Sequence, residues 1–133
     1  MKEKVYILEG SPIPLARARY TGRRVWDSQK HLKLVTGIAL ANQHGDHPLY
    51  AGPIHMEIDF FMPMPQDPRK RKKMDGNYHC YKPDIDNLIK FIADIANGIL
   101  YNDDCIISSI ISKKIYDEEP RTEITIREID GPK

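Results

Sequence analysis

Cysteines and long apolar segments are both scarce in this sequence. Only Cys80 and Cys105 occur among 133 residues, too few for the disulfide framework of a small secreted domain. Together with His55 and His79 they do not show the spacing of a zinc site. Apolar segments such as residues 54–62 are too short to span a bilayer. We therefore expect neither a disulfide scaffold, nor a zinc finger, nor a membrane protein.

We also expect no secretory leader. The first residues are charged and lead directly into an apolar run at residues 5–8, without a signal region or a cleavage site. Charged residues make up 29% of the chain and the mean hydropathy is −0.52, as in globular proteins. We expect one domain over residues 1–133, in the cytoplasm.

Charge is distributed unevenly along the chain. The net charge is only +1, but residues 1–82 carry 14 basic and 8 acidic side chains, whereas residues 83–133 carry 6 basic and 11 acidic ones. This polarity is compatible with a phosphate-binding surface joined to an acidic site. Alternatively, the two halves intermix in the fold and the asymmetry has no functional meaning.

Hydrophobic periodicity predicts a mixed α+β fold. Strict alternation predicts a strand over residues 54–62, and β-branched or apolar runs predict further strands at residues 5–8, 106–116 and 123–129. Two main helices are predicted, one from Asp27 or Ser28 to Asn42 and one over residues 85–99. The acidic turn at residues 117–120 predicts a hairpin or near-hairpin between the last two strands.

Two basic segments are candidate DNA contacts. Residues 11–24 contain two prolines and favour an extended arm, and residues 63–82 favour a mobile loop. Arginine and lysine in such segments bind phosphates with little base information, although a charge run alone is more often only a solvated surface. The side chains concerned are Arg17, Arg19, Arg23, Arg24, Arg69, Lys70, Arg71, Lys72 and Lys73.

The acidic residues concentrate at the start of the second helix and just after it. Pro83 biases the chain towards an extended form, so Asp84 can cap the helix while Asp86 occupies its first turn and Lys90 follows one turn later on the same face. A short return after the helix can bring Asp103 or Asp104 back towards that site. The alternative is that these aspartates only cap a helix and form a turn.

Gathered carboxylates repel one another and either take up protons or bind a hard divalent ion. Mg²⁺ suits oxygen ligands best and commonly bridges carboxylates to a substrate phosphate. The sequence therefore indicates a magnesium site, for which Mn²⁺ is a possible substitute.

Three segments of the chain follow one another at tight spacing. They are Lys82-Pro83-Asp84-Ile85-Asp86-Asn87-Leu88 with Lys90, then Gly98-Ile99-Leu100-Tyr101-Asn102-Asp103-Asp104, and then Glu118-Glu119-Pro120-Arg121. Together they resemble the RusA family of Holliday junction resolvases. The resemblance is densest over residues 82–126. It implies a homodimeric α+β endonuclease that binds four-way DNA junctions and makes paired nicks with Mg²⁺ or Mn²⁺, in DNA recombination and repair.

The resemblance also assigns site residues. Asp84 and Asp86 match the two carboxylates of the family's helix-start motif, Lys90 matches its essential lysine, and Asp104 most resembles the third metal ligand. Asp103 either supports Asp104 or takes its place as the third metal ligand. The products are expected to carry a 5′-phosphate and a 3′-hydroxyl. A less selective nuclease that cuts flaps or duplexes, and a junction-binding module without catalysis, are the alternatives.

Overall fold

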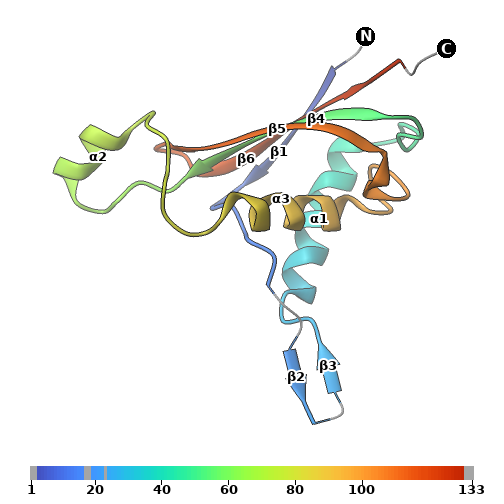
Figure 1. The fold of residues 1–133 in the computed structure, drawn as a ribbon, viewed down its shortest axis with the longest axis horizontal. Coiled ribbons are helices and arrows are strands. Elements are labelled where there is room, and N and C mark those ends of the chain that lie inside the picture. The colour runs from blue at the N-terminus through green and yellow to red at the C-terminus, as the bar shows by residue number, and fades with distance from the viewer. Residues whose placement is uncertain (1–2, 17–18, 23, 131–133) are drawn as a thin grey trace.

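A four-stranded mixed sheet forms the body of the protein, as Figure 1 shows in a computed structural model that describes residues 3–16, 19–22 and 24–130. Its strands have the order β1-β6-β4-β5. β4 runs parallel to β5 and antiparallel to β6, which is antiparallel to β1. The mixed sheet predicted from the sequence is therefore confirmed. The strands are β1 (Glu3–Glu9), β4 (Ile54–Met62), β5 (Ile107–Tyr116) and β6 (Arg121–Glu128).

The predicted hairpin between the last two strands is wrong. β5 and β6 do not pair with each other, because each lies along one side of β4. The alternating side chains of β4 are buried at every second position, which makes it the natural central strand. The connection from β4 to the parallel β5 has to cross over the sheet, and it does so through a helix.

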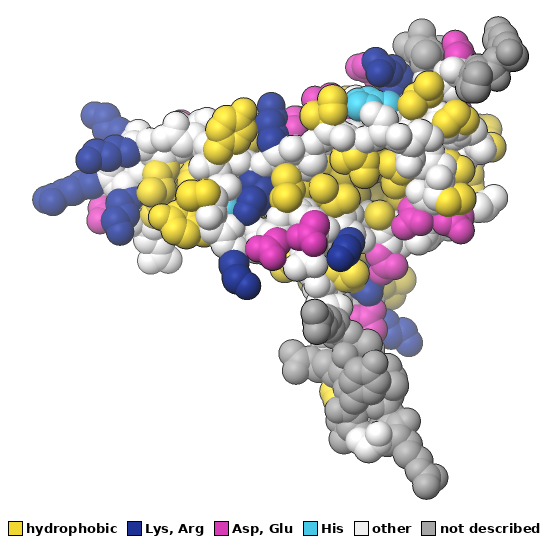
Figure 2. Space-filling model, viewed as in Figure 1, with side chains coloured by type: hydrophobic (Ala, Val, Ile, Leu, Met, Phe, Trp, Pro, Cys, Tyr) yellow, Lys and Arg dark blue, Asp and Glu magenta, His cyan; other side chains and the backbone are white. Residues whose placement is uncertain are grey.

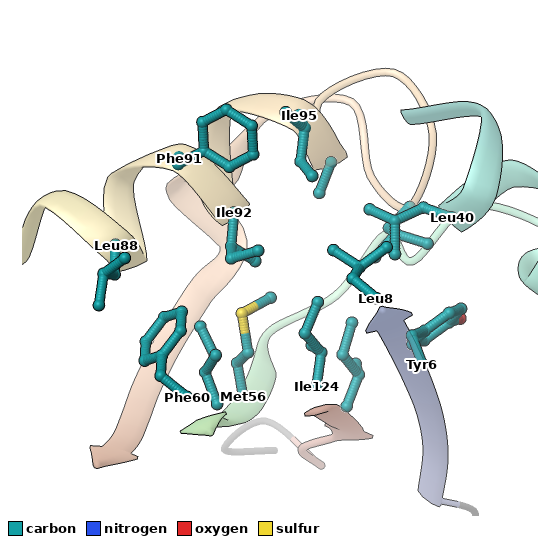
Figure 3. Packing of buried hydrophobic residues seen from close by; sticks show 14 of the residues in the cluster. Tyr6, Leu8, Leu40, Met56, Phe60, Leu88, Phe91, Ile92, Ile95 and Ile124 are labelled. Carbon is teal, nitrogen blue, oxygen red and sulfur yellow. The ribbon is translucent and has the colours of Figure 1, made fainter. Parts of the chain in front are cut away.

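Helices α1 (Lys30–His44) and α3 (Ile85–Ala96) cover one face of the sheet (Figure 1). The apolar side of α3 faces β4 and β6, as Figure 3 shows for Leu88, Phe91 and Ile92 above Phe60 and Ile124. Both helices were predicted. α1 begins slightly later than expected, since Gln29 is its N-cap and the Asp27 carboxylate accepts a hydrogen bond from the Gln29 backbone N–H at 2.8 Å.

Two segments predicted to lack regular structure contain it. The basic arm includes a short antiparallel hairpin of β2 (Arg19–Thr21) and β3 (Arg24–Trp26), and the loop after β4 contains helix α2 (Pro68–Met74). Asp67 caps α2 by accepting the Arg69 backbone N–H at 2.9 Å, and proline is well tolerated at a first helical position. Local capping therefore outweighs the repulsion within the basic run.

A short 3-10 turn, η1 (Asp104–Ile106), connects the end of α3 to β5. Among the helices in the described part of the chain, none is sufficiently long and apolar to cross a bilayer.

Candidate active site

The acidic motif forms the beginning of α3. Asp84 is the N-cap, with extended backbone angles (φ −68°, ψ 141°), and Asp86 lies in the first turn, as predicted. The Asp84 carboxylate makes no capping hydrogen bond, and both side chains are exposed. The helix dipole favours negative charge at this end. The start of α3 therefore presents two carboxylates to solvent.

Lys90 projects from the same face of α3, one turn after Asp86. Its Nζ lies 3.8 Å from Asp86 Oδ2, and the two side chains are 62% and 66% exposed. An exposed pair of this kind contributes little to stability. Both groups are therefore free to exchange this contact for a contact with a bound ligand.

The segment before α3 is held in place by a lysine of β5. Lys114 Nζ donates hydrogen bonds to the carbonyl oxygens of Tyr81 and Pro83, each at 2.7 Å. On the other side, the Leu15 backbone N–H donates to the Asn87 carbonyl oxygen at 3.0 Å. These contacts flank the first turn of α3, so they fix the backbone from which Asp84 and Asp86 project.

A second acidic group lies after the other end of α3. Asp103 Oδ1 accepts a hydrogen bond from the Cys105 backbone N–H at 3.0 Å. This bond is the largest cause that lowers the pKa of Asp103 below its ordinary value, and a hydrogen bond from Asp104 is the second. The pKa of Asp104 is raised, first by desolvation and then by the hydrogen bond and the charge of Asp103, with Asp94 adding to the effect. Asp104 is therefore the carboxyl of this pair that takes up a proton first as the pH falls.

The structure does not bring Asp104 back to Asp84 and Asp86. Within the described residues, no three His, Cys, Asp or Glu side chains are grouped closely enough to hold a metal ion. Asp94, whose charge Asp104 senses, lies eight residues after Asp86, which corresponds to about 12 Å along a helix. The predicted convergence of three carboxylates is therefore not found within one chain.

The cause is the tight turn that follows α3. The Gly98 backbone N–H donates to the Tyr101 carbonyl oxygen at 2.7 Å, and the Tyr101 hydroxyl donates to the Ala93 carbonyl oxygen at 3.1 Å. These bonds keep the turn against the last part of the helix. Asp103 and Asp104 follow directly and therefore remain at that end.

Of the predicted DNA contacts, the run in α2 is well defined. Arg69, Lys70, Lys72 and Lys73 are exposed, whereas Arg71 is partly covered and forms an ion pair with Glu118 at 2.7 Å. That pair attaches α2 to the turn between β5 and β6. Figure 2 shows the resulting cluster of basic side chains at the α2 end of the molecule.

The basic arm is described only in part. Arg19 lies in β2 and Arg24 in β3, so the two belong to one hairpin. Arg17 and Arg23 lie outside the described residues.

Asp94 and Lys114 were not identified from the sequence. Asp94 contributes negative charge near Asp104 and also pairs with Lys33 of α1 at 3.1 Å. Asp94 lies eight residues after Asp86, which places the two carboxylates on the same side of α3. This spacing could have identified Asp94 from the sequence. The role of Lys114 depends on long-range pairing, for which no local pattern exists.

Comparison with known proteins shows the class to which this arrangement belongs. Residues 9–127 match the family described as Endodeoxyribonuclease RusA, and the match extends from the end of β1 into β6. The chain therefore belongs to the RusA family of endodeoxyribonucleases.

Two relatives illustrate the similarity. An uncharacterized protein of Bacillus subtilis, YqaN, is 30% identical over 137 aligned residues, which cover 95% of this chain and 96% of the relative. A protein of Lactococcus phage r1t named crossover junction endodeoxyribonuclease rusA is 33% identical over 78 residues, covering 58% of this chain and 56% of the phage protein.

Proposed function

We propose that the protein is a Holliday junction resolvase, which makes paired nicks in four-way DNA junctions during recombination and repair in the cytoplasm. It leaves 5′-phosphate and 3′-hydroxyl ends that a ligase can rejoin. Membership of the RusA family supports nuclease activity, and the name of the phage relative supports the junction as substrate.

One structural observation carries the proposal. Asp84, which makes no capping hydrogen bond, and Asp86 are exposed carboxylates at the start of α3 beside Lys90, while exposed basic side chains lie on α2, the preceding helix in the chain. Carboxylates repel a phosphate chain unless a cation lies between them. Exposed carboxylates on the same molecule as a cluster of basic side chains are therefore the combination expected of a nuclease that uses a divalent ion.

The donor chemistry fits Mg²⁺. RusA-family nucleases generally use divalent metal ions, and Mg²⁺ is commonly bound through one or two carboxylates together with substrate phosphate oxygens. Asp84 and Asp86 would be the ligands at the start of α3, and Mn²⁺ would suit the same oxygens. When bound, such an ion neutralises phosphate charge and lowers the pKa of a coordinated water.

The remaining steps fall to the side chains of the chain itself. Lys90 gives up its weak contact with Asp86 and stabilises the charge that builds on the phosphate oxygens. Basic residues of α2 and of the arm hold the flanking phosphates, and thereby position the scissile bond over the start of α3. Lys114 acts as a positioning residue, because it fixes the backbone from which Asp84 projects.

Two copies of the chain would complete the acidic site. A two-fold axis across α3 sets two copies of this helix antiparallel, so the end of one helix lies beside the start of the other. The partner subunit's Asp104, or its neighbour Asp103, then joins Asp84 and Asp86, which the chain alone does not achieve. Exposed apolar side chains of α1 beside α3, namely Leu34, Val35 and Ile38, support such self-association.

Cleavage of a labelled four-way junction and of a matched duplex tests the proposal. Wild type, Asp86→Asn and Asp46→Asn are compared with Mg²⁺ and with EDTA. Asp46 is exposed in the loop after α1, so its replacement controls for the loss of one surface charge. We expect wild type and Asp46→Asn to cut only the junction and only with Mg²⁺, and Asp86→Asn to bind the junction without cutting it.

Other outcomes would contradict specific parts of the proposal. Equal cleavage of junction and duplex by wild type would indicate a less selective nuclease. Binding without cleavage under any divalent ion would favour the junction-binding module. An Asp86→Asn variant as fast as wild type would exclude the start of α3 as the reacting site.

A further inference from the structure

Two tyrosine rings between α2 and α3 project into solvent. Tyr78 is 75% exposed and Tyr81 is 64% exposed, the two largest exposed fractions among the large hydrophobic side chains of the described residues. The remaining tyrosines whose burial the structure describes, such as Tyr6 and Tyr101, contribute to the core or to its margin. A pair of large exposed rings close together in sequence indicates a binding surface.

The backbone that carries these rings is firmly attached. Tyr78 forms a bridge with Ile115 of β5, and the His79 backbone N–H donates to the Lys114 carbonyl oxygen at 2.9 Å. The Tyr81 carbonyl oxygen accepts a hydrogen bond from the Lys114 ammonium group at 2.7 Å. The tyrosines are therefore presented from an ordered extension of the sheet, which lowers the entropy cost of binding a ligand.

His79 directly follows Tyr78, and its Nδ1 is buried. Its ring lies edge-on to Tyr81 at 6.1 Å and packs on Tyr116 at 4.9 Å, both between ring centroids. Tyr78 precedes this side chain and Tyr81 lies two residues after it, and both tyrosines remain largely exposed to solvent. Most of the surface of each tyrosine is therefore accessible to a flat ligand.

The surroundings of the rings identify that ligand as a nucleic acid. The exposed basic side chains of α2 precede the tyrosines, Lys82 follows them, and Asp84 begins the acidic site three residues after Tyr81. Figure 2 shows hydrophobic side chains on the surface between the basic cluster and the acidic side chains over the start of α3. An apolar protein segment would not need this basic border, whereas a phosphate chain with an accessible base matches both features.

We propose that Tyr78 and Tyr81 form a stacking platform for bases displaced from the branch point of the junction. The inference rests on the proposed function and explains how the protein would distinguish branched DNA from a continuous duplex. A continuous duplex keeps its bases stacked and offers no free base face, whereas a branch point offers bases that unpair at low cost. Stacking on tyrosine is tolerant of base identity, so the platform selects structure and not sequence.

Binding and fluorescence measurements on four variants test the platform. Tyr78→Ala, Tyr81→Ala and the conservative Tyr78→Phe and Tyr81→Phe are titrated, without a divalent ion, into a labelled four-way junction and a duplex of the same length. One junction strand carries 2-aminopurine at the branch point, because its emission is quenched when it stacks on an aromatic ring.

Each alanine variant is expected to bind the junction about tenfold more weakly than wild type, within a range of roughly fivefold to a hundredfold. Affinity for the duplex should stay unchanged, and both phenylalanine variants should match wild type. At saturating protein, 2-aminopurine emission should be lower with wild type than with the alanine variants.

Three results would overturn the inference: unchanged junction affinity in both alanine variants, an equal loss on junction and duplex, or emission that does not differ between wild type and the alanine variants. Wild-type cleavage of the junction, measured in parallel, separates the two proposals. If wild type cuts junctions while the alanine variants bind normally, the platform is wrong and the proposed function stands. If wild type neither binds nor cuts junctions, the proposed function itself fails.

Discussion

Neutralising the exposed basic side chains of α2 is expected to flatten the salt dependence of DNA binding. The variant replaces Arg69, Lys70, Lys72 and Lys73 with glutamine and retains Arg71, whose ion pair with Glu118 attaches the helix. Glutamine preserves helix propensity, so the change removes charge without removing α2.

The magnitude follows from counterion release. Each phosphate contact on duplex DNA contributes a slope of about 0.9 to the dependence of log affinity on log salt, so four contacts contribute up to about 3.6. Between about 50 and 200 mM salt, this slope corresponds to an affinity loss roughly 150-fold larger for wild type than for the variant.

Fluorescence anisotropy of a labelled junction, titrated without divalent ions across that salt range, measures both slopes. A variant that replaces Lys4 and Arg127 with glutamine controls for the loss of basic charge away from α2, because these side chains belong to β1 and β6 at the opposite end of the sheet from α2 (Figure 1). Identical slopes for wild type and the α2 variant would refute the assignment of α2 as a phosphate-binding surface, as would an equal change in the control.

Two further predictions concern side chains of the sheet. Lys114→Met removes the donor to the Tyr81 and Pro83 carbonyls. We expect urea unfolding to show a loss of about 2 kcal/mol of stability, the scale of a hydrogen bond from a charged group, and we expect slower cleavage of the junction. An unchanged cleavage rate would contradict the positioning role of Lys114. Asp59 in β4 has a buried Oδ1 that finds no hydrogen-bond partner among the residues the structure describes, and burial raises the pKa of its carboxyl above the ordinary value of 3.8. Because the folded state binds this proton more tightly, stability falls as the pH rises through the range between the unfolded and folded pKa. Asp59→Asn should therefore be about 1 kcal/mol more stable than wild type at pH 7, with the difference shrinking towards pH 4; a constant difference across that range would contradict the titration of Asp59.

Local pattern was sufficient for the elements with one strongly apolar face. α3 buries Leu88, Phe91, Ile92 and Ile95 at helical spacing, and β4 buries every second residue, so periodicity alone placed both. Strand pairing, in contrast, cannot be predicted from local periodicity. β5 and β6 are adjacent in sequence, yet both pair with β4, because the gain from covering both sides of the central strand outweighs a short connection.

The site could be predicted to a similar extent. Asp84 as the cap, Asp86 in the first turn and Lys90 on the same face follow from helix geometry and from Pro83. The position of Asp104 depends on the bonds that hold Tyr101 against the end of α3, and these are tertiary contacts that no local motif specifies. The sequence pattern therefore indicated which carboxylates are present but not that they lie at opposite ends of one helix.

Mixing of two inactive variants tests most directly whether the acidic site is shared between subunits. Asp86→Asn and Asp104→Asn are each expected to be inactive, because each removes one carboxylate from both sites of its homodimer. In a mixed dimer of a shared-site enzyme, both substitutions fall in one site and the other site is intact. An equal mixture, allowed to exchange subunits, should therefore nick a labelled four-way junction at about a quarter of the wild-type rate, since about half of the dimers hold one intact site of two. A mixture as inactive as its two components, or an Asp104→Asn homodimer that cuts like wild type, would contradict the shared site.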